Sequence, residues 1–140
     1  MEQRADKHIK FFVSLINRLI VKKPDLLIFD RLYLTQAFRA KGNVKDYAEI
    51  EELLSRYAPL TIFLRVDESE IQDRISKAAE HRSSDYFKFQ GTSEEGALYY
   101  INQQRNLLEL IKSSAIPYKI FDTTNHKYEG IAKEIIHLID

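Results

Sequence analysis

The sequence predicts an α/β fold in which a parallel β-sheet is flanked by helices. Short apolar runs of strand length alternate with longer stretches whose apolar residues recur every three or four positions, and this alternation is typical of such a fold. The chain has 140 residues, of which 44% are hydrophobic and 30% charged, which is the balance of one globular domain. We therefore expect a single domain over residues 1–140.

The first half of the chain predicts two helices and two strands. Apolar residues at helical spacing predict a helix over about residues 4–21. Residues 26–29, Leu-Leu-Ile-Phe, form a short apolar run between two aspartates and predict a strand buried on both faces. A second helical pattern covers residues 47–57 and stops before Pro59, and residues 60–66 predict the next strand.

The second half continues the alternation with three helices and one strand. A third helix begins at Asp67, where Glu70 three residues later completes a capping signature. Residues 81–92 are polar and lack a clean period, so they predict a loop. A long helix over about residues 92–114, a strand over residues 116–121 and a last helix over about residues 128–139 follow.

Charge and composition exclude several classes of function. Lys and Arg together number 21, as do Asp and Glu, so the basic surplus expected of a protein that binds a nucleic-acid polymer is missing. There is no cysteine, which excludes disulfides, thiolate nucleophiles and cysteine zinc sites. No apolar stretch approaches the about 20 residues of a membrane-spanning helix, and the charged start has no signal-peptide core. We expect a cytoplasmic protein that associates with no membrane.

Charged residues follow the predicted strands, where open α/β folds bind their ligands. Asp30 and Arg31 come directly after the first strand, and Asp122 follows the last. A carboxylate in this position can hold Mg²⁺ through water, and an arginine offers a planar pair of donors to phosphate oxygens. Asp30 could equally cap the next segment, with Arg31 in solvent. On the first interpretation, Asp30, Arg31, Arg82 and Asp122 gather along one edge of the sheet.

Four segments, taken in order, resemble the thymidylate-kinase branch of the P-loop nucleoside and nucleotide monophosphate kinases. The first is Asp30-Arg31 followed by Thr35-Gln36-Ala37-Phe38, one residue shorter than the family spacing. The second is the strand at residues 60–66 with its acidic helix ending in Arg74-Ile75. The third, Arg82-Ser83-Ser84-Asp85-Tyr86, is similar to the LID, which places a LID-like loop at residues 81–92. The fourth is Asp122-Thr123-Thr124-Asn125, and the resemblance covers about residues 20–140.

The resemblance implies ATP and Mg²⁺ as cofactors and a nucleoside or nucleotide as phosphoryl acceptor. Asp30 would organise the magnesium ion, and Arg31 would contact phosphates of donor and acceptor. Arg74 and Arg82 would neutralise the transferring phosphoryl group, a plausible role because phosphoryl transfer is catalysed mostly by positioning and charge stabilisation. The turn formed by Asp122, Thr123 and Thr124 would cradle the adenine of ATP.

Two further residues are candidates for contact with the acceptor. Phe38 stands where the family has an aromatic side chain beside the acceptor base, although plain core packing is an equal alternative. Arg4 would correspond to the family's base-reading arginine. The arginines of the LID lie about four residues apart in the family, whereas Arg74 and Arg82 lie eight apart. Either the loop carries an insertion here, or Lys77 shares their task.

The phosphate-cradling loop of these kinases is missing from these residues. None of the four glycines opens a Gly-x-x-x-x-Gly-Lys-Ser/Thr pattern, whose glycines let the backbone approach phosphate. The chain resembles the carboxyl-terminal part of the fold, without the first strand and P-loop. We expect it to be inactive alone, and to form a homo-oligomer or to associate with a P-loop-bearing chain.

Two other functions remain open. The chain could be a non-catalytic descendant of the kinase fold that binds nucleotide or phosphate, or that serves only as a scaffold. It could also be an unrelated α/β module that binds protein partners. Stabilisation by nucleotides would separate the binding proteins from the third possibility, because a ligand stabilises the state that binds it.

Overall fold

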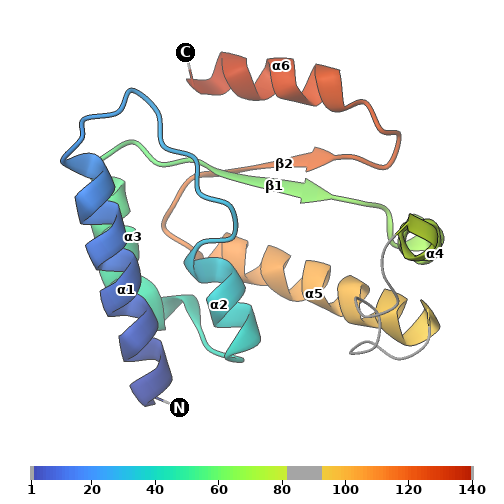
Figure 1. The fold of residues 1–140 in the computed structure, drawn as a ribbon, viewed down its shortest axis with the longest axis horizontal. Coiled ribbons are helices and arrows are strands. Elements are labelled where there is room, and N and C mark those ends of the chain that lie inside the picture. The colour runs from blue at the N-terminus through green and yellow to red at the C-terminus, as the bar shows by residue number, and fades with distance from the viewer. Residues whose placement is uncertain (1, 82–92, 140) are drawn as a thin grey trace. The chain divides into compact units, whose positions relative to one another are not determined.

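The computed structural model describes residues 2–81 and 93–139 (Figure 1). The chain divides into two compact units. Unit 1 comprises Met1–Thr61 and Asn106–Pro117, and unit 2 comprises Ile62–Arg105 and Tyr118–Asp140. Each unit has its own cluster of buried apolar side chains.

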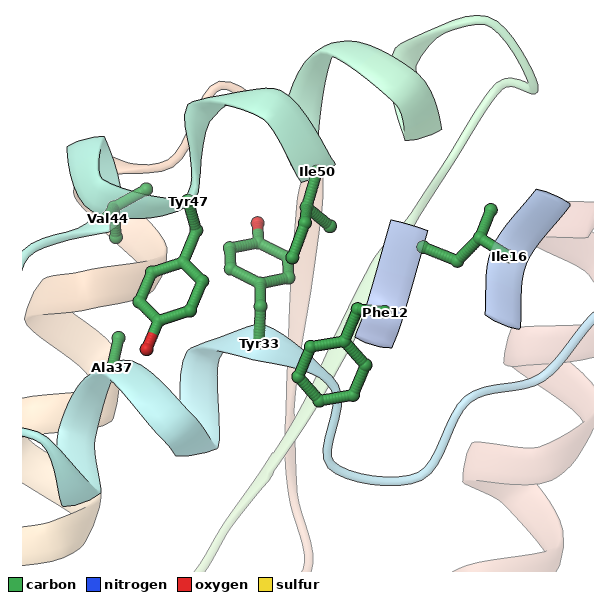
Figure 2. Packing of buried hydrophobic residues seen from close by; sticks show 7 residues of the cluster. All are labelled: Phe12, Ile16, Tyr33, Ala37, Val44, Tyr47 and Ile50. Atoms are coloured by element: carbon green, nitrogen blue, oxygen red, sulfur yellow. The ribbon is translucent and has the colours of Figure 1, made fainter. Parts of the chain in front are cut away.

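Unit 1 is built almost entirely from helices. It contains α1 (Glu2–Ile20), α2 (Tyr33–Arg39), the 3₁₀ helix η1 (Val44–Tyr47), α3 (Ala48–Ser55) and the end of α5. One face of α1 is apolar at helical spacing, as the sequence predicted, and that face enters the core. The buried cluster, drawn in Figure 2, comprises Phe12, Ile16, Tyr33, Ala37, Val44, Tyr47 and Ile50.

Helix α2 was not predicted from the sequence. It is only seven residues long, and its first residue is preceded by Leu32, which makes no side-chain capping bond. Short helices without a cap carry little local signal, and their stability comes from packing. Here Tyr33 and Ala37 supply that packing, because both side chains are buried in the core of unit 1.

Unit 2 contains a two-stranded parallel sheet flanked by helices. Strand β1 (Thr61–Arg65) begins at the end of unit 1 and pairs with β2 (Tyr118–Asp122), and both run in the same direction in Figure 1. The Thr61 N–H donates to Pro117 O, and the Thr123 N–H donates to Arg65 O, each at 2.8 Å. The prediction of a parallel sheet with helices on it is therefore confirmed at this level.

The helices of unit 2 match the predicted pattern closely. They are α4 (Glu68–His81), the first part of α5 (Ser93–Ser113) and α6 (Tyr128–Ile139). Buried Ile71 and Ile75 of α4 pack with Ala97 of α5. Helix α6 differs from the other two in having no buried residue, because its apolar side chains are at most half-buried.

The predicted strand at residues 26–29 is wrong. These residues form neither strand nor helix, and within the described chain no backbone hydrogen bond reaches them. A strand requires a neighbour to accept and donate its ladder bonds, and this apolar run has none. The described residues thus hold two strands where the sequence predicted three.

No helix within residues 2–81 and 93–139 has both the length and the apolar character needed to cross a bilayer.

Candidate functional site

The predicted residues that the structure brings together lie at the carboxyl ends of β1 and β2, within unit 2. The chain leaves β1 through Val66 and Asp67, and it leaves β2 through a turn at residues 122–125. In parallel sheets both strand ends open at the same edge, which is where α/β folds place ligands. Three of the predicted residues, Asp122, Thr123 and Thr124, form this turn.

An ion pair joins the last residues of the two strands. Arg65 donates from Nε and Nη2 to the same Asp122 oxygen, Oδ2, at 3.0 and 2.8 Å. Both side chains are 46% exposed, so the pair contributes little to stability. It does fix the direction of the Asp122 carboxylate, because two donors from one planar guanidinium hold a single oxygen.

The turn after β2 is held by its own threonines. Thr123 donates both its N–H and its hydroxyl to Arg65 O, at 2.8 and 2.9 Å, and so extends the strand pairing by one residue. The Thr124 N–H donates to Asp122 Oδ1 at 2.9 Å, and the Asp67 N–H donates to Thr124 Oγ1 at 2.8 Å. The turn is therefore an ordered element tied to the segment that follows β1.

Arg74 of α4 reaches the same turn. Its Nη2 donates to the carbonyl oxygens of Thr123 and Thr124, at 2.5 and 2.9 Å. Its Nε is buried and has no hydrogen-bond partner among the described residues. Arg74 is thus committed to the backbone of the turn.

A glutamine of α5 completes the end of β1. Gln104 accepts from the Val66 N–H at 2.9 Å and donates to Val66 O at 2.8 Å, so its amide pairs with the backbone as a neighbouring strand would. One residue further on, Arg105 forms a two-point ion pair with Glu68 at the start of α4. No pattern in the sequence singles out Gln104, because its role depends on where α5 lies against β1.

These contacts lower the pKa values of three carboxyl groups. Hydrogen bonds from Thr124, followed by those from Arg65, lower the pKa of Asp122 to about 2. The hydroxyl and N–H of Ser69 lower the pKa of Asp67, and the guanidinium of Arg105 lowers that of Glu68. All three groups are anions at neutral pH, because each contact favours the charged form.

The arrangement supports binding rather than acid–base chemistry. A carboxyl group whose pKa is held low is a weak proton acceptor near neutral pH. The N–H groups of Thr123 and Thr124 are already bonded, to Arg65 O and to Asp122 Oδ1 respectively, whereas Asn125 is exposed. A ligand at this edge would therefore be recognised by exposed side chains on a fixed backbone.

Asp30 and Arg31 lie in unit 1, between α1 and α2. Arg31 Nε is 4.0 Å from Asp30 Oδ1, and the side chains are 71% and 95% exposed for Arg31 and Asp30 respectively. Arg31 also has a positive φ of 58°, an unusual backbone conformation for a residue other than glycine. Because Asp122 belongs to unit 2, the gathering of these residues along one sheet edge stays a prediction.

No preformed metal cage surrounds Asp30. In the described ranges, no group of three or more His, Asp or Glu side chains is arranged to hold a metal ion. A single exposed carboxylate such as that of Asp30 binds Mg²⁺ only when substrate phosphates and water supply most of the ligands.

The remaining predicted residues lie in α1, in α2, in α4 and outside the described residues. Phe38 lies in α2 and is half-buried, and Arg4 lies in the first turns of α1. Lys77, the alternative cation of the LID, forms an ion pair with Asp73 one helical turn away. Arg82 lies outside the described residues, as does the LID-like loop beyond His81.

A polar cluster inside unit 1 was missed by sequence reasoning. Glu51 Oε1 accepts hydrogen bonds from Tyr33 Oη at 2.6 Å and from Ser114 Oγ at 2.5 Å, while Oε2 accepts from the Ala115 N–H at 3.2 Å. Glu51 is only 9% exposed and Tyr33 only 2%. The only sequence signal was the position of Glu51 beside Ile50, and because α3 reads Ala-Glu-Ile-Glu-Glu-Leu-Leu-Ser, nothing local distinguishes Glu51 from its two neighbouring glutamates.

Comparisons with known proteins found no relative: no protein-family model, no curated protein and no solved structure matches this chain.

Proposed function

We propose that this chain is the carboxyl-terminal part of an ATP-dependent nucleotide kinase of the thymidylate-kinase type, and that alone it binds adenine nucleotide without transferring phosphate. One observation carries the proposal. Arg74 and the turn of Asp122, Thr123 and Thr124 came from separate segments of the sequence, and they meet at the carboxyl ends of parallel strands. That edge is the usual ligand site of open α/β sheets.

The turn would bind the adenine base, with Arg74 as a positioning residue. Its bonds to two carbonyl groups hold the backbone of the turn in one conformation before a ligand arrives. Preorganisation of this kind lowers the entropy lost on binding. Exposed Asn125 offers both a donor and an acceptor, which is what hydrogen bonding to the edge of adenine requires.

Asp30, Arg31 and Arg82 would serve the phosphates. Asp30 would supply one ligand to Mg²⁺, whose charge would neutralise phosphate oxygens once nucleotide is bound. Arg31 and Arg82 would donate to the transferring group, which carries its negative charge on several oxygens. Phe38 and Arg4 would contact the base of the acceptor.

Phosphoryl transfer would need a second component. These residues contain no Gly-x-x-x-x-Gly-Lys-Ser/Thr loop to cradle the β- and γ-phosphates. A P-loop-bearing chain, or another copy in a homo-oligomer, is the partner that this proposal requires. In a coupled assay with ATP, Mg²⁺ and TMP, we expect no turnover from the isolated chain. Turnover of roughly 1–100 per second, the ordinary kinase range, would contradict this.

Binding is tested by calorimetry with ADP, ATP and inorganic phosphate. We expect ADP to bind with a Kd below about 1 mM and to raise the melting temperature, because a ligand stabilises the state it binds. Asn125→Ala changes only an exposed side chain, and we expect it to weaken ADP binding about tenfold, the loss of one good hydrogen bond. Arg56→Ala, at an exposed ion pair of α3, is the control and should leave binding unchanged.

A non-catalytic scaffold is the second candidate, and a specific observation favours it. The three arginines described at the strand ends of unit 2 are all engaged within the protein: Arg65 with Asp122, Arg74 with carbonyl groups and Arg105 with Glu68. An anion would have to displace these partners. The same titration decides between the two, because a folded chain that binds neither ADP nor ATP is not a nucleotide-binding protein.

A further inference from the structure

Residues 25–31 lie between α1 and α2. Their sequence is typical of a β-strand, but no neighbouring strand pairs with them in the described chain. Side-chain exposure alternates along them: Leu26 is 51% exposed and Ile28 83%, while Leu27 and Phe29 are half-buried. Phe29 packs against the core of unit 1. This period of two is typical of an extended segment with one face on a core.

The backbone of this segment is the second feature that marks it as a strand without a partner. Within the described residues no hydrogen bond reaches the N–H or C=O groups of residues 26–29. An extended apolar segment with free backbone groups is a template for pairing with another strand. Ile28 is the most exposed of the large apolar side chains described.

We propose that residues 25–31 pair antiparallel with the same residues of a second copy, with Ile28 opposite Ile28 on the two-fold axis. Such an interface is self-complementary, because each copy contributes the same residues to both sides. It would cover the two Ile28 side chains and satisfy the backbone groups on the edge of each segment that faces the other. The proposal does not depend on nucleotide binding.

The charges at the two ends of the segment favour this register, and they favour a second copy of the chain as the binding partner. With Ile28 on the axis, Asp25 of each copy lies opposite Arg31 of the other, so two opposite-charge pairs close the ends of the ladder. A shift that places Leu27 opposite Ile28 would instead set Asp25 against Asp30, and like charges directly opposite are unfavourable. The segment is thus complementary to itself in one register.

The ends of the segment limit the interface to a few residues. Lys23 and Arg31 both have positive φ, at 48° and 58°, and Pro24 has no N–H to donate. A ladder confined between them buries little area, and interfaces of under about 1,200 Å² are commonly weak. We therefore expect a concentration-dependent dimer, which a concentration series up to about 1 mM should reveal.

A single cysteine tests the two-fold contact directly. The chain has no cysteine of its own, so Ile28→Cys introduces one thiol at the proposed axis. Opposite residues of an antiparallel pair have Cα atoms about 4.5–5.5 Å apart, within the range of a disulfide. We expect mild oxidation to give a covalent dimer. Phe11→Cys introduces a thiol at an exposed apolar position of α1 (61% exposed) outside the proposed interface, and as the control it should give no covalent dimer.

Charge exchange tests the register. Asp25→Arg and Arg31→Asp should each abolish the dimer, because each places like charges opposite one another twice. Mixing the two variants should restore association as a heterodimer, in which both pairs are again of opposite sign. Sedimentation velocity of each variant and of the mixture, with circular dichroism as a check of folding, measures this.

Several outcomes would overturn the proposal. They are a wild-type chain that is monomeric throughout the concentration series, an Ile28→Cys variant that cross-links no faster than Phe11→Cys, and a mixture that fails to associate. A segment that pairs only with a separate P-loop-bearing chain would give the first of these results. A dimer that survives both charge variants would use a different surface.

Discussion

Two carboxylates, one in each unit, accept similar hydrogen bonds in opposite surroundings. Glu51 of unit 1 is 9% exposed and is bonded to two hydroxyl groups and one backbone N–H, with no ion-pair partner in residues 2–81 and 93–139. The Asp122 side chain of unit 2 is 46% exposed and is bonded to Arg65 and to the Thr124 N–H. Water can replace the partners of Asp122, whereas Tyr33, whose hydroxyl bonds to Glu51, is only 2% exposed.

The two carboxylates have different roles: one contributes to the stability of its unit, and the other sets the conformation of a turn. Donors left without an acceptor in a core lose their hydrogen bonds outright, whereas exposed donors regain them from water. Glu51 therefore belongs to the folding of unit 1, since it joins α2, α3 and the residues after α5. The contacts of Asp122 instead set the conformation of the turn at residues 122–125, and they contribute little to stability.

The largest expected effect comes from removing the buried carboxylate. Glu51→Ala leaves the hydroxyls of Tyr33 and Ser114 and the Ala115 N–H without their acceptor. We expect the free energy of unfolding to fall by about 3 kcal/mol, measured by urea denaturation. Glu52→Ala removes a neighbouring glutamate of the same helix whose side chain is 76% exposed, and it should change that energy by less than about 0.5 kcal/mol. Equal effects of the two variants would mean that burial does not distinguish these carboxylates.

At high pH, ionisation of Tyr33 should make the stability of the chain depend on the buried cluster around Glu51. Burial, followed by the hydrogen bond to Glu51, raises the pKa of Tyr33 well above its usual value of 10.0. The native state keeps this proton while the unfolded state releases it, so the stabilisation is present below pH 10 and is lost as pH rises. The free energy of unfolding should fall with a slope of up to about 1.4 kcal/mol per pH unit from this one group.

Tyr33→Phe supplies the check on this slope. The variant should be less stable than the wild type near neutral pH, since a hydroxyl bonded to Glu51 is lost, and it should lose less stability above pH 10. Tyr57→Phe, at a 52% exposed tyrosine, is the matched control and should keep the wild-type slope. An unchanged slope in Tyr33→Phe would show that other groups govern unfolding at alkaline pH.

The smallest expected effect lies in acid, at Asp122. Its pKa is lowered from 3.8 to about 2, so its contribution to stability is present above pH 3.8 and is lost as pH falls toward 2. Asp122→Asn should flatten the decline of melting temperature over this window and lower the value at neutral pH by the same small amount, because the variant lacks the contribution that the wild type loses in acid. A carboxyl resonance of Asp122 that titrates in NMR near 3.8 would contradict the contacts with Thr124 and Arg65.

The helices were predictable to the extent that their signals are local. The spacing of apolar residues in α1, α4, α5 and α6 is present in each segment by itself, and it does not depend on the rest of the chain. Helix α2 was not predicted because seven residues without a side-chain cap carry too little of this periodic signal. The turn at residues 122–125 was identified by its position after a strand and by its resemblance to a kinase motif.

The sequence could not predict which strands pair with each other or which distant residues form hydrogen bonds. Residues 26–29 read as a strand as clearly as β1 does, yet one has no neighbour among the described residues and the other has β2. The bonds between Gln104 and Val66, and between Glu51 and Ser114, join residues 38 and 63 positions apart. Nothing in either local segment marks the other as its partner.

The sequence by itself determined the helices with a clear apolar period, α1, α4, α5 and α6, which short runs can be strands and where charged residues follow them, because these properties depend on periods of a few residues. Only the tertiary structure decided that β1 pairs with β2, that residues 26–29 stay unpaired within the described chain, and that Arg74 serves the backbone of the turn. The physical reason is that a hydrogen bond satisfies two groups at once, so its formation depends on where a distant residue lies.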